Sequence, residues 1–184
     1  MVSVLTPPPG GAILDVACGT GDVILEIQHQ KGVDIRVIGS DFAPNMLRLA
    51  RQKLDLTTGR PPVDLVAGNA LQMPFQSNRF DAVTIAFGIR NIQDKEKALR
   101  AFCDVLVPGG MALVLELATP KKGRLHDMYM AYFRRVLPIV GRFFSKHAFA
   151  YTYLPDSVSR FPQPDAFMAI MTRAGFAHVR VRRL

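Results

Sequence analysis

The feature that most constrains the fold is a short apolar run that ends in an acid and leads directly into a glycine-rich turn. Residues Ile13–Asp22 read Ile-Leu-Asp-Val-Ala-Cys-Gly-Thr-Gly-Asp, and a second apolar run, Ile38–Asp41, also ends in a carboxylate. Each run is typical of a buried strand in a parallel sheet, and the turn is typical of the start of a helix. Together they predict a nucleoside pocket, because glycines let the backbone approach the ligand and the second acid can accept ribose hydroxyl groups.

Charge and a missing glycine bear on which nucleoside is bound. Asp15 places a negative charge at the end of the first run, which suits a cationic amino-acid tail and favours S-adenosylmethionine (SAM). A dinucleotide is the alternative, but its fingerprint needs a third glycine where this chain has Ile24. Asp41 follows the glycines by about 20 residues, which fits both cofactors. A purely structural turn also stays open at this point.

Apolar strands alternate with helical stretches through the first 120 residues. Strands are predicted at Ala12–Val16, Arg36–Gly39, Val63–Ala67, Ala82–Ala86 and Met111–Leu117. Helices are predicted at Asp22–Gln30, Ala43–Leu54 and Lys95–Leu106, and Val107–Gly110 is predicted to turn the chain into the fifth strand. This alternation predicts an α/β fold with a mostly parallel sheet and helices on both faces.

The last third of the chain breaks this alternation. Residues 121–161 are rich in aromatic side chains and arginine, and they predict a small helical cap inserted after the fifth strand. A helix is predicted at Pro164–Ala174, ended by Gly175, and a short strand at Phe176–Val181.

Length and composition indicate one folded domain over residues 1–184, with 49% hydrophobic residues. The two cysteines, Cys18 and Cys103, give neither a disulfide framework nor a zinc-binding spacing, which favours a reducing compartment. The N-terminus has no secretory signal pattern, and no apolar stretch reaches the ~18 residues of a spanning helix. We therefore expect a cytoplasmic protein.

Charge is distributed unevenly along the chain. Residues 1–120 contain 11 basic and 12 acidic residues, whereas residues 121–184 contain 12 basic and 3 acidic residues, a net charge of +9. The second part predicts a basic face that meets an anionic partner, either a membrane surface or a nucleic acid.

Polar residues follow the predicted strands at the edge where ligands bind in an open parallel sheet. Asn69 follows the third strand and can offer its amide to an adenine ring, although an ordinary turn asparagine fits equally well. Arg90 and Asn91 follow the fourth strand directly after an apolar run. Arg90 either pairs with a carboxylate as a structural residue or faces the substrate.

Several motifs resemble known methyltransferases. The run Asp15-x-x-Cys18-Gly19-x-Gly21-Asp22 resembles motif I of class I methyltransferases. Later blocks are similar to the ubiquinone/menaquinone C-methyltransferase family: Gly88-Ile89-Arg90-Asn91, Leu106-x-Pro108-Gly109-Gly110 and Tyr151-x-Tyr153-Leu154. The resemblance covers residues 11–180.

The resemblance implies a Rossmann-like, metal-free methyltransferase that moves the methyl group of SAM to a ring carbon of a polyprenylated quinol. The quinol is of the demethylmenaquinol or 2-polyprenyl-6-methoxy-benzoquinol type, in menaquinone or ubiquinone biosynthesis. Arg90 would stabilise the phenolate charge and Asn91 would position the quinol oxygen, with His126 and His147 as weaker candidates for proton transfer. The implied cofactor-binding residues are Asp15, Ala17, Gly19, Gly21, Asp41, Phe42, Met46, Asn69, Ala70 and Phe87.

The sequence departs from the family pattern at both ends. The family carries an N-terminal helical segment with a Tyr-Asp-x-x-Asn pattern and a C-terminal strand hairpin. We expect this chain to lack that segment and the second strand of the hairpin, both of which bear on closure over the substrate.

The basic, aromatic part of the chain suggests partners. Residues Leu125–Phe161 can supply an apolar groove for a polyprenyl tail or can pack as ordinary core, and the basic face predicts peripheral contact at the inner face of a membrane. We expect no nucleic-acid partner, and the sequence is compatible with a homodimer. Two other functions stay open: a SAM-dependent RNA methyltransferase, suggested by the basic end Arg180–Arg183, and a non-catalytic cofactor-binding relative.

Overall fold

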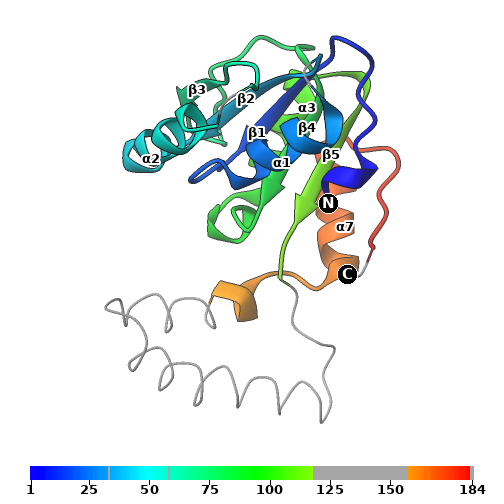
Figure 1. The fold of residues 1–184 in the computed structure, drawn as a ribbon. Helices are drawn as coiled ribbons and strands as arrows, with labels where there is room; N and C mark the ends of the chain where they lie inside the picture. Colours follow the sequence, from blue (N-terminus) through cyan, green and yellow to red (C-terminus); the bar gives the residue numbers. More distant parts are fainter. Residues whose placement is uncertain (33, 58, 118–156, 183–184) are drawn as a thin grey trace, which may run out of the picture. The chain divides into compact units, whose positions relative to one another are not determined.

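The structure, a computed structural model, describes residues 1–32, 34–57, 59–117 and 157–182. Its centre is a five-stranded parallel sheet with the strand order β3-β2-β1-β4-β5 (Figure 1). The strands are β1 (Ala12–Val16), β2 (Arg36–Asp41), β3 (Asp64–Ala67), β4 (Phe80–Ala86) and β5 (Leu106–Leu115). The predicted parallel α/β fold is confirmed.

Three helices connect these strands. Helix α1 (Asp22–Lys31) joins β1 to β2, α2 (Pro44–Asp55) joins β2 to β3, and α3 (Lys95–Val105) joins β4 to β5. Parallel crossovers are right-handed, and the chain moves outward from β1 in one direction and from β4 in the other, so α1 and α2 cover one face and α3 the other. The three predicted helices agree with these bounds to within one residue at each end.

Apolar side chains from both layers form the core. Ile24 and Ile27 of α1 are fully buried in a cluster with Ile13 of β1 and Ala82 of β4. Ile13 and Ala82 are partners in the parallel register. Because side chains alternate between the faces of a sheet, residues two positions further along each strand return to this same face.

Strand β5 begins earlier than the sequence predicts. Phe80 pairs with Leu106, and Ala82 pairs with Met111, so Val107–Gly110 form an irregularity within the strand pairing instead of a turn that precedes it. The predicted start of the fifth strand at Met111 is therefore wrong. The physical reason is that Leu106 pairs with Phe80 immediately after α3. Gly109, with a φ of +81°, then lets the chain bend so that the residues between the two paired stretches are accommodated.

The predicted strand Phe176–Val181 is also wrong, because residues 176–182 have no strand assignment. A strand needs a hydrogen-bonded neighbour, and among the described residues β5 pairs with β4 alone. Val181 is half exposed, so it gains little from packing. The preceding helix α7 (Pro164–Ala174) has the predicted bounds, and Gly175 follows it with a φ of +116°.

The chain divides into two compact units, Met1–Glu116 with Arg173–Ala177 and Leu117–Thr172 with His178–Leu184. The first unit also contains two short 3-10 helices, η1 (Val2–Val4) and η2 (Ile89–Asn91). Most of the predicted cap at 121–161 lies outside the described residues, as do His126 and His147, and the single-domain interpretation stays a prediction. None of the described helices is both long and apolar enough to span a bilayer.

Candidate functional site at the carboxyl ends of the strands

The predicted site residues lie at or after the carboxyl ends of four neighbouring strands. The strand order reverses direction between β1 and β4, which is the position where open α/β sheets bind ligands. The residues are Asp15, Ala17, Gly19 and Gly21 at β1, Asp41, Phe42 and Met46 at β2, Asn69 and Ala70 at β3, and Phe87, Arg90 and Asn91 at β4. The fold therefore brings the predicted residues to one edge of the sheet.

The turn after β1 has a backbone that leaves room for a ligand. Ala17, Gly19 and Gly21 have φ values of +51°, +54° and +84°. A Cβ atom added to Gly19 would meet no atom within 4 Å, whereas one added to Gly21 would lie 3.5 Å from Cβ of Ala50. Gly19 is thus open to an approaching ligand, and Gly21 allows close packing of α2 while α1 begins.

Asp41 links this turn to the start of α2. Its Oδ2 accepts a hydrogen bond from the Gly19 amide at 2.8 Å, and its Oδ1 accepts one from the Ala43 amide at 2.8 Å. The residue is only 9% exposed. Each carboxylate oxygen can accept a further hydrogen bond, so Asp41 can still receive ribose hydroxyl groups while it holds two backbone segments.

Asp15 is a buried carboxyl group with one oxygen unused. The hydroxyl group of Thr84 donates to Oδ1 at 2.6 Å, while Oδ2 has no hydrogen-bond partner among the described residues. Burial raises the pKa of Asp15 from 3.8 to about 7, the Thr84 hydrogen bond opposes that rise, and the nearby Asp41 carboxylate adds to it. An unpaired buried acceptor that ionises near neutrality fits a cationic group such as the ammonium of an amino-acid tail.

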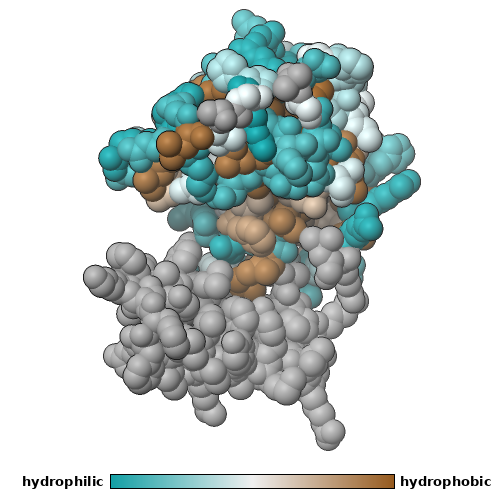
Figure 2. All heavy atoms as spheres, viewed as in Figure 1, coloured by the Kyte–Doolittle hydropathy of each residue, from teal (hydrophilic) through white to brown (hydrophobic). Residues whose placement is uncertain are grey.

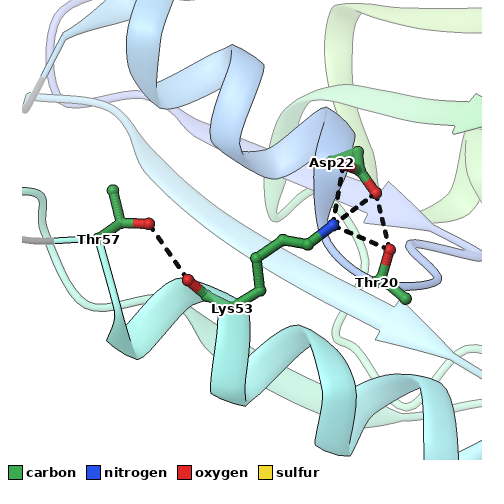
Figure 3. A network of polar contacts seen from close by, with 4 residues as sticks. All are labelled: Thr20, Asp22, Lys53 and Thr57. Atoms are coloured by element: carbon green, nitrogen blue, oxygen red, sulfur yellow. Dashed lines mark hydrogen bonds and ion pairs between the residues drawn. The ribbon is translucent and has the colours of Figure 1, made fainter.

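An ion-pair network holds the outer side of the glycine turn (Figure 3). Lys53 of α2 contacts both carboxylate oxygens of Asp22 at 2.9 Å and donates to the Thr20 hydroxyl group at 3.2 Å. Thr20 in turn donates to Asp22 at 2.7 Å. Lys53 lowers the pKa of Asp22. The turn is therefore held from inside by Asp41 and from outside by Lys53.

Exposed apolar side chains also lie at this edge. The surface in Figure 2 is largely hydrophilic over the first unit, with hydrophobic patches between. Phe42 is 77% exposed, and Met46 and Phe87 are partly exposed. Asn69 is exposed, and its side-chain oxygen accepts a hydrogen bond from the Leu71 amide at 2.9 Å, which leaves its NH₂ group to bind a ligand. These groups suit the faces and edges of a planar base.

The segment after β4 approaches the glycine turn closely. A Cβ atom on Gly88 would lie 2.7 Å from Cβ of Ala17, so only glycine fits there. Arg90 forms an ion pair with Glu116 at 2.5 Å, and its backbone amide donates to the same carboxylate at 3.2 Å. Their side chains are 12% and 3% exposed. The guanidinium carbon lies 6.0 Å from the centre of the Phe87 ring.

The pairing alternative for Arg90 is thus observed, while its role toward a substrate stays a prediction. Its Nε atom is buried and has no partner among the described residues, so one donor remains unused. Asn91 is exposed beside it.

Sequence reasoning gave no role to Thr84 or Glu116. Both act through residues that are far away in sequence, 69 positions for Thr84 and Asp15 and 26 positions for Arg90 and Glu116. The available signal for Thr84 was a hydroxyl side chain inside the apolar run of β4. For Glu116 it was an acid directly after β5.

Comparison with known proteins identifies the family. The ubiE/COQ5 methyltransferase family matches residues 1–184. The chain belongs to this family. It is 41% identical over 172 residues to the ubiquinone/menaquinone biosynthesis C-methyltransferase UbiE of Geotalea daltonii, covering 94% of this chain and 73% of the relative. It is 47% identical over 165 residues to the demethylmenaquinone methyltransferase of Thermus thermophilus, covering 90% and 74%.

The UbiE of Geobacter sulfurreducens is 44% identical, with 91% of this chain and 65% of the relative covered. The chain therefore spans about two thirds to three quarters of the length of these curated relatives. The predicted family is confirmed, and with it an S-adenosylmethionine-dependent methyltransferase as enzyme class.

Solved structures support the fold alone. The YcgJ protein of Bacillus subtilis matches with a TM-score of 0.69 and 19% identity, covering 95% of this chain and 65% of that chain. A putative methyltransferase of Bacillus halodurans matches with a TM-score of 0.69 and 21% identity, covering 95% and 66%. Both likenesses agree with the Rossmann-like class I methyltransferase fold.

Proposed function

We propose that this chain transfers the methyl group of SAM to a ring carbon of a polyprenylated quinol in menaquinone or ubiquinone biosynthesis. Family membership and the names of the relatives support this activity. The structural observation that carries it is the buried acid of β1, whose free oxygen lies beside an open glycine turn held by a second acid. This arrangement fits a cofactor with a cationic tail and a ribose.

The residues present fit SAM part by part. Oδ2 of Asp15 would bind the cationic tail, Asp41 would accept the ribose hydroxyl groups, and the backbone at Gly19 would lie against the ligand. When bound, SAM supplies a methyl group on a positively charged sulfur atom. The protein's contribution is mainly orientation, because the substrate carbon must face that methyl group in line with the sulfur.

Arg90 is the proposed electrostatic partner of the quinol oxygen. Its guanidinium carries five N–H donors, of which Glu116 takes only some, and the unused Nε–H can donate to a developing phenolate. An arginine side chain stabilises negative charge and does not act as a base, so Arg90 is assigned no proton transfer. Asn91, next in the chain, would position the same oxygen.

The activity is tested by supplying SAM that carries a trideuterated methyl group together with a chemically reduced quinol. We expect mass spectrometry to find the label on the ring of demethylmenaquinol, of 2-polyprenyl-6-methoxy-benzoquinol, or of both, which also assigns the ring class. The Asp41→Ala variant serves as control and should transfer no label. Label found only in added RNA would contradict the proposal, as would SAM binding without any transfer.

Peripheral contact at the cytoplasmic, inner face of a membrane is part of the proposal. It is supported by the +9 net charge of residues 121–184 and by the apolar character of a polyprenyl tail, which keeps the substrate in the bilayer. We expect the chain to co-sediment with vesicles that contain anionic lipid, and to be released by salt because the attraction is screened. Equal binding to uncharged vesicles would contradict this contact.

A further inference from the structure

Thr84 and Asp15 form a buried pair across two parallel strands. They are direct partners in the register of β1 and β4, two positions beyond the core pair Ile13 and Ala82. Both side chains therefore lie on the α1 face of the sheet, and Thr84 is 0% and Asp15 1% exposed. The 2.6 Å hydrogen bond between them follows from this register and from the short reach of both side chains.

The pair uses one oxygen of the carboxylate and leaves the other free. An ionised carboxylate is only an acceptor, so the single proton of the Thr84 hydroxyl group must point at Oδ1. That contact fixes the carboxylate plane and leaves Oδ2 buried with no partner among the described residues. Thr84 is itself fully buried, and valine has the same branched shape, so a valine at position 84 would fill the same space. The role of the hydroxyl group is therefore to donate a hydrogen bond to Asp15, and core packing does not require it.

We infer that Thr84 is a positioning residue for the cofactor: by donating to Oδ1 it favours the ionised form of Asp15 and orients the carboxylate, so that Oδ2 can bind the cationic ammonium group of the amino-acid tail. The inference rests on the proposed use of SAM and deepens it. It assigns to β4 a part in cofactor binding, in addition to the substrate-facing residues that follow that strand.

The groups around Asp15 make this role dependent on pH. Burial raises the pKa of Asp15 to about 7, and the Thr84 hydrogen bond lowers it. Asp41, the last residue of β2, raises it further by repulsion, whereas the thiol of Cys18 stays neutral because burial raises its pKa to about 12. Removal of the Thr84 hydroxyl group therefore moves the pKa of Asp15 upward, and the acid is less ionised at neutral pH.

The test is calorimetric titration of wild type, Thr84→Val and Thr84→Ser with S-adenosylhomocysteine, which keeps the ammonium group. If the lost hydrogen bond raises the pKa by about one unit, Thr84→Val binds about tenfold more weakly near pH 6, about fivefold near pH 7 and less than about twofold near pH 8.5. Thr84→Ser restores the wild-type profile. 5′-Methylthioadenosine, which lacks the amino-acid tail, binds equally to all three proteins.

Controls separate this role from general damage. Thr57→Val removes a hydroxyl group that donates to the Lys53 carbonyl at the end of α2 and should leave both affinities unchanged. Circular dichroism checks folding, and Thr84→Ala provides a second variant without the hydroxyl group should the valine variant not fold. Weaker binding by the same factor at every pH, or equal weakening for both ligands, would overturn the inference. Failure of the wild type to bind S-adenosylhomocysteine would instead overturn the proposed cofactor.

Discussion

The two halves of the site handle charge in opposite ways. At the ends of β1 and β2, Asp15 and Asp41 lie close together with no cationic side chain bound to either in the described residues, and they are held by a hydroxyl group and backbone amides. At the ends of β4 and β5, Arg90 and Glu116 neutralise each other. The first half therefore has a negative charge left for a ligand, and the second has a balanced pair with a spare donor.

This difference separates two kinds of cost. A buried acid without a cationic partner lowers the free energy of unfolding while no ligand is bound. A cationic ligand that binds the acid removes this destabilisation, which adds to the free energy of binding. A buried ion pair is costly mainly when one partner is removed. Variants on the two sides should therefore respond differently to pH and to ligand.

The largest expected effect is the pH dependence that Asp15 imparts to stability. Its pKa is about 7 in the folded protein and near 3.8 when unfolded, so the folded state holds the proton more tightly. The resulting stabilisation is complete below about pH 4 and is lost as pH rises through about 7, a change of about 4 kcal/mol. We expect urea unfolding to show this slope in wild type and not in Asp15→Asn. Parallel curves for the two proteins would contradict the assignment.

The next effect is on the balanced pair. Arg90→Met leaves the Glu116 carboxylate, 3% exposed, without its guanidinium partner and should cost about 3 kcal/mol of unfolding free energy. Adding Glu116→Gln should recover part of that loss, because the carboxylate charge that has lost its guanidinium partner is then removed as well. Urea unfolding of both single variants and the double variant measures the coupling. Additive losses would show that the two residues act independently.

A smaller effect is expected at Asp41, where both oxygens accept backbone hydrogen bonds. Asp41→Asn replaces one acceptor by an NH₂ group that faces a backbone N–H, so the turn at Gly19 loses a restraint. We expect S-adenosylhomocysteine to bind about 30-fold more weakly, or about 2 kcal/mol. The matched variant Asp64→Asn alters an exposed acid that pairs with Arg36 and should bind normally. Equal affinities for wild type and Asp41→Asn would remove Asp41 from the cofactor site.

The smallest effect concerns the outer support of the glycine turn. Lys53 and Asp22 are 39% and 75% exposed, so solvent screens their attraction. Lys53→Met should weaken S-adenosylhomocysteine binding by no more than about fivefold, and the difference should shrink at high salt. Lys53→Arg should retain most of the affinity. A loss that high salt leaves unchanged would point to packing instead of charge.

Local patterns in the sequence predicted most of the fold. The run Ala12–Val16 and the helix Pro164–Ala174 have the predicted bounds, because an apolar run before a glycine turn and a periodic stretch before Gly175 are local signals. The irregularity at Val107–Gly110 was not predictable in the same way, since it depends on which residues of β4 pair with residues of β5. Residues 176–181 have a sequence that favours a strand, but they have no strand partner among the described residues.

The candidate site shows the same difference between local sequence signals and contacts that are distant in sequence. The placement of Asp15, Asp41 and Gly19 at one edge of the sheet could be predicted because each comes at the end of an apolar run or in the turn after it, and parallel strands bring their carboxyl ends together. Thr84 and Glu116 were missed because their contacts depend on register and on neighbouring strands, which no short motif encodes. The sequence left the pairing of Arg90 open, and the structure supplies Glu116 as its partner.

In the proposed cofactor site, the free oxygen of a buried, partly protonated Asp15 binds the cationic tail of the cofactor. Calorimetric titration of wild type with S-adenosylhomocysteine near pH 7, in two buffers with different ionisation enthalpies, measures the protons exchanged on binding. Because Asp15 has a pKa of about 7 and a bound cation lowers it, we predict release of about half a proton per ligand. Asp15→Asn should abolish this release. Binding without proton release by the wild type would contradict the proposed contact between Asp15 and the cationic tail.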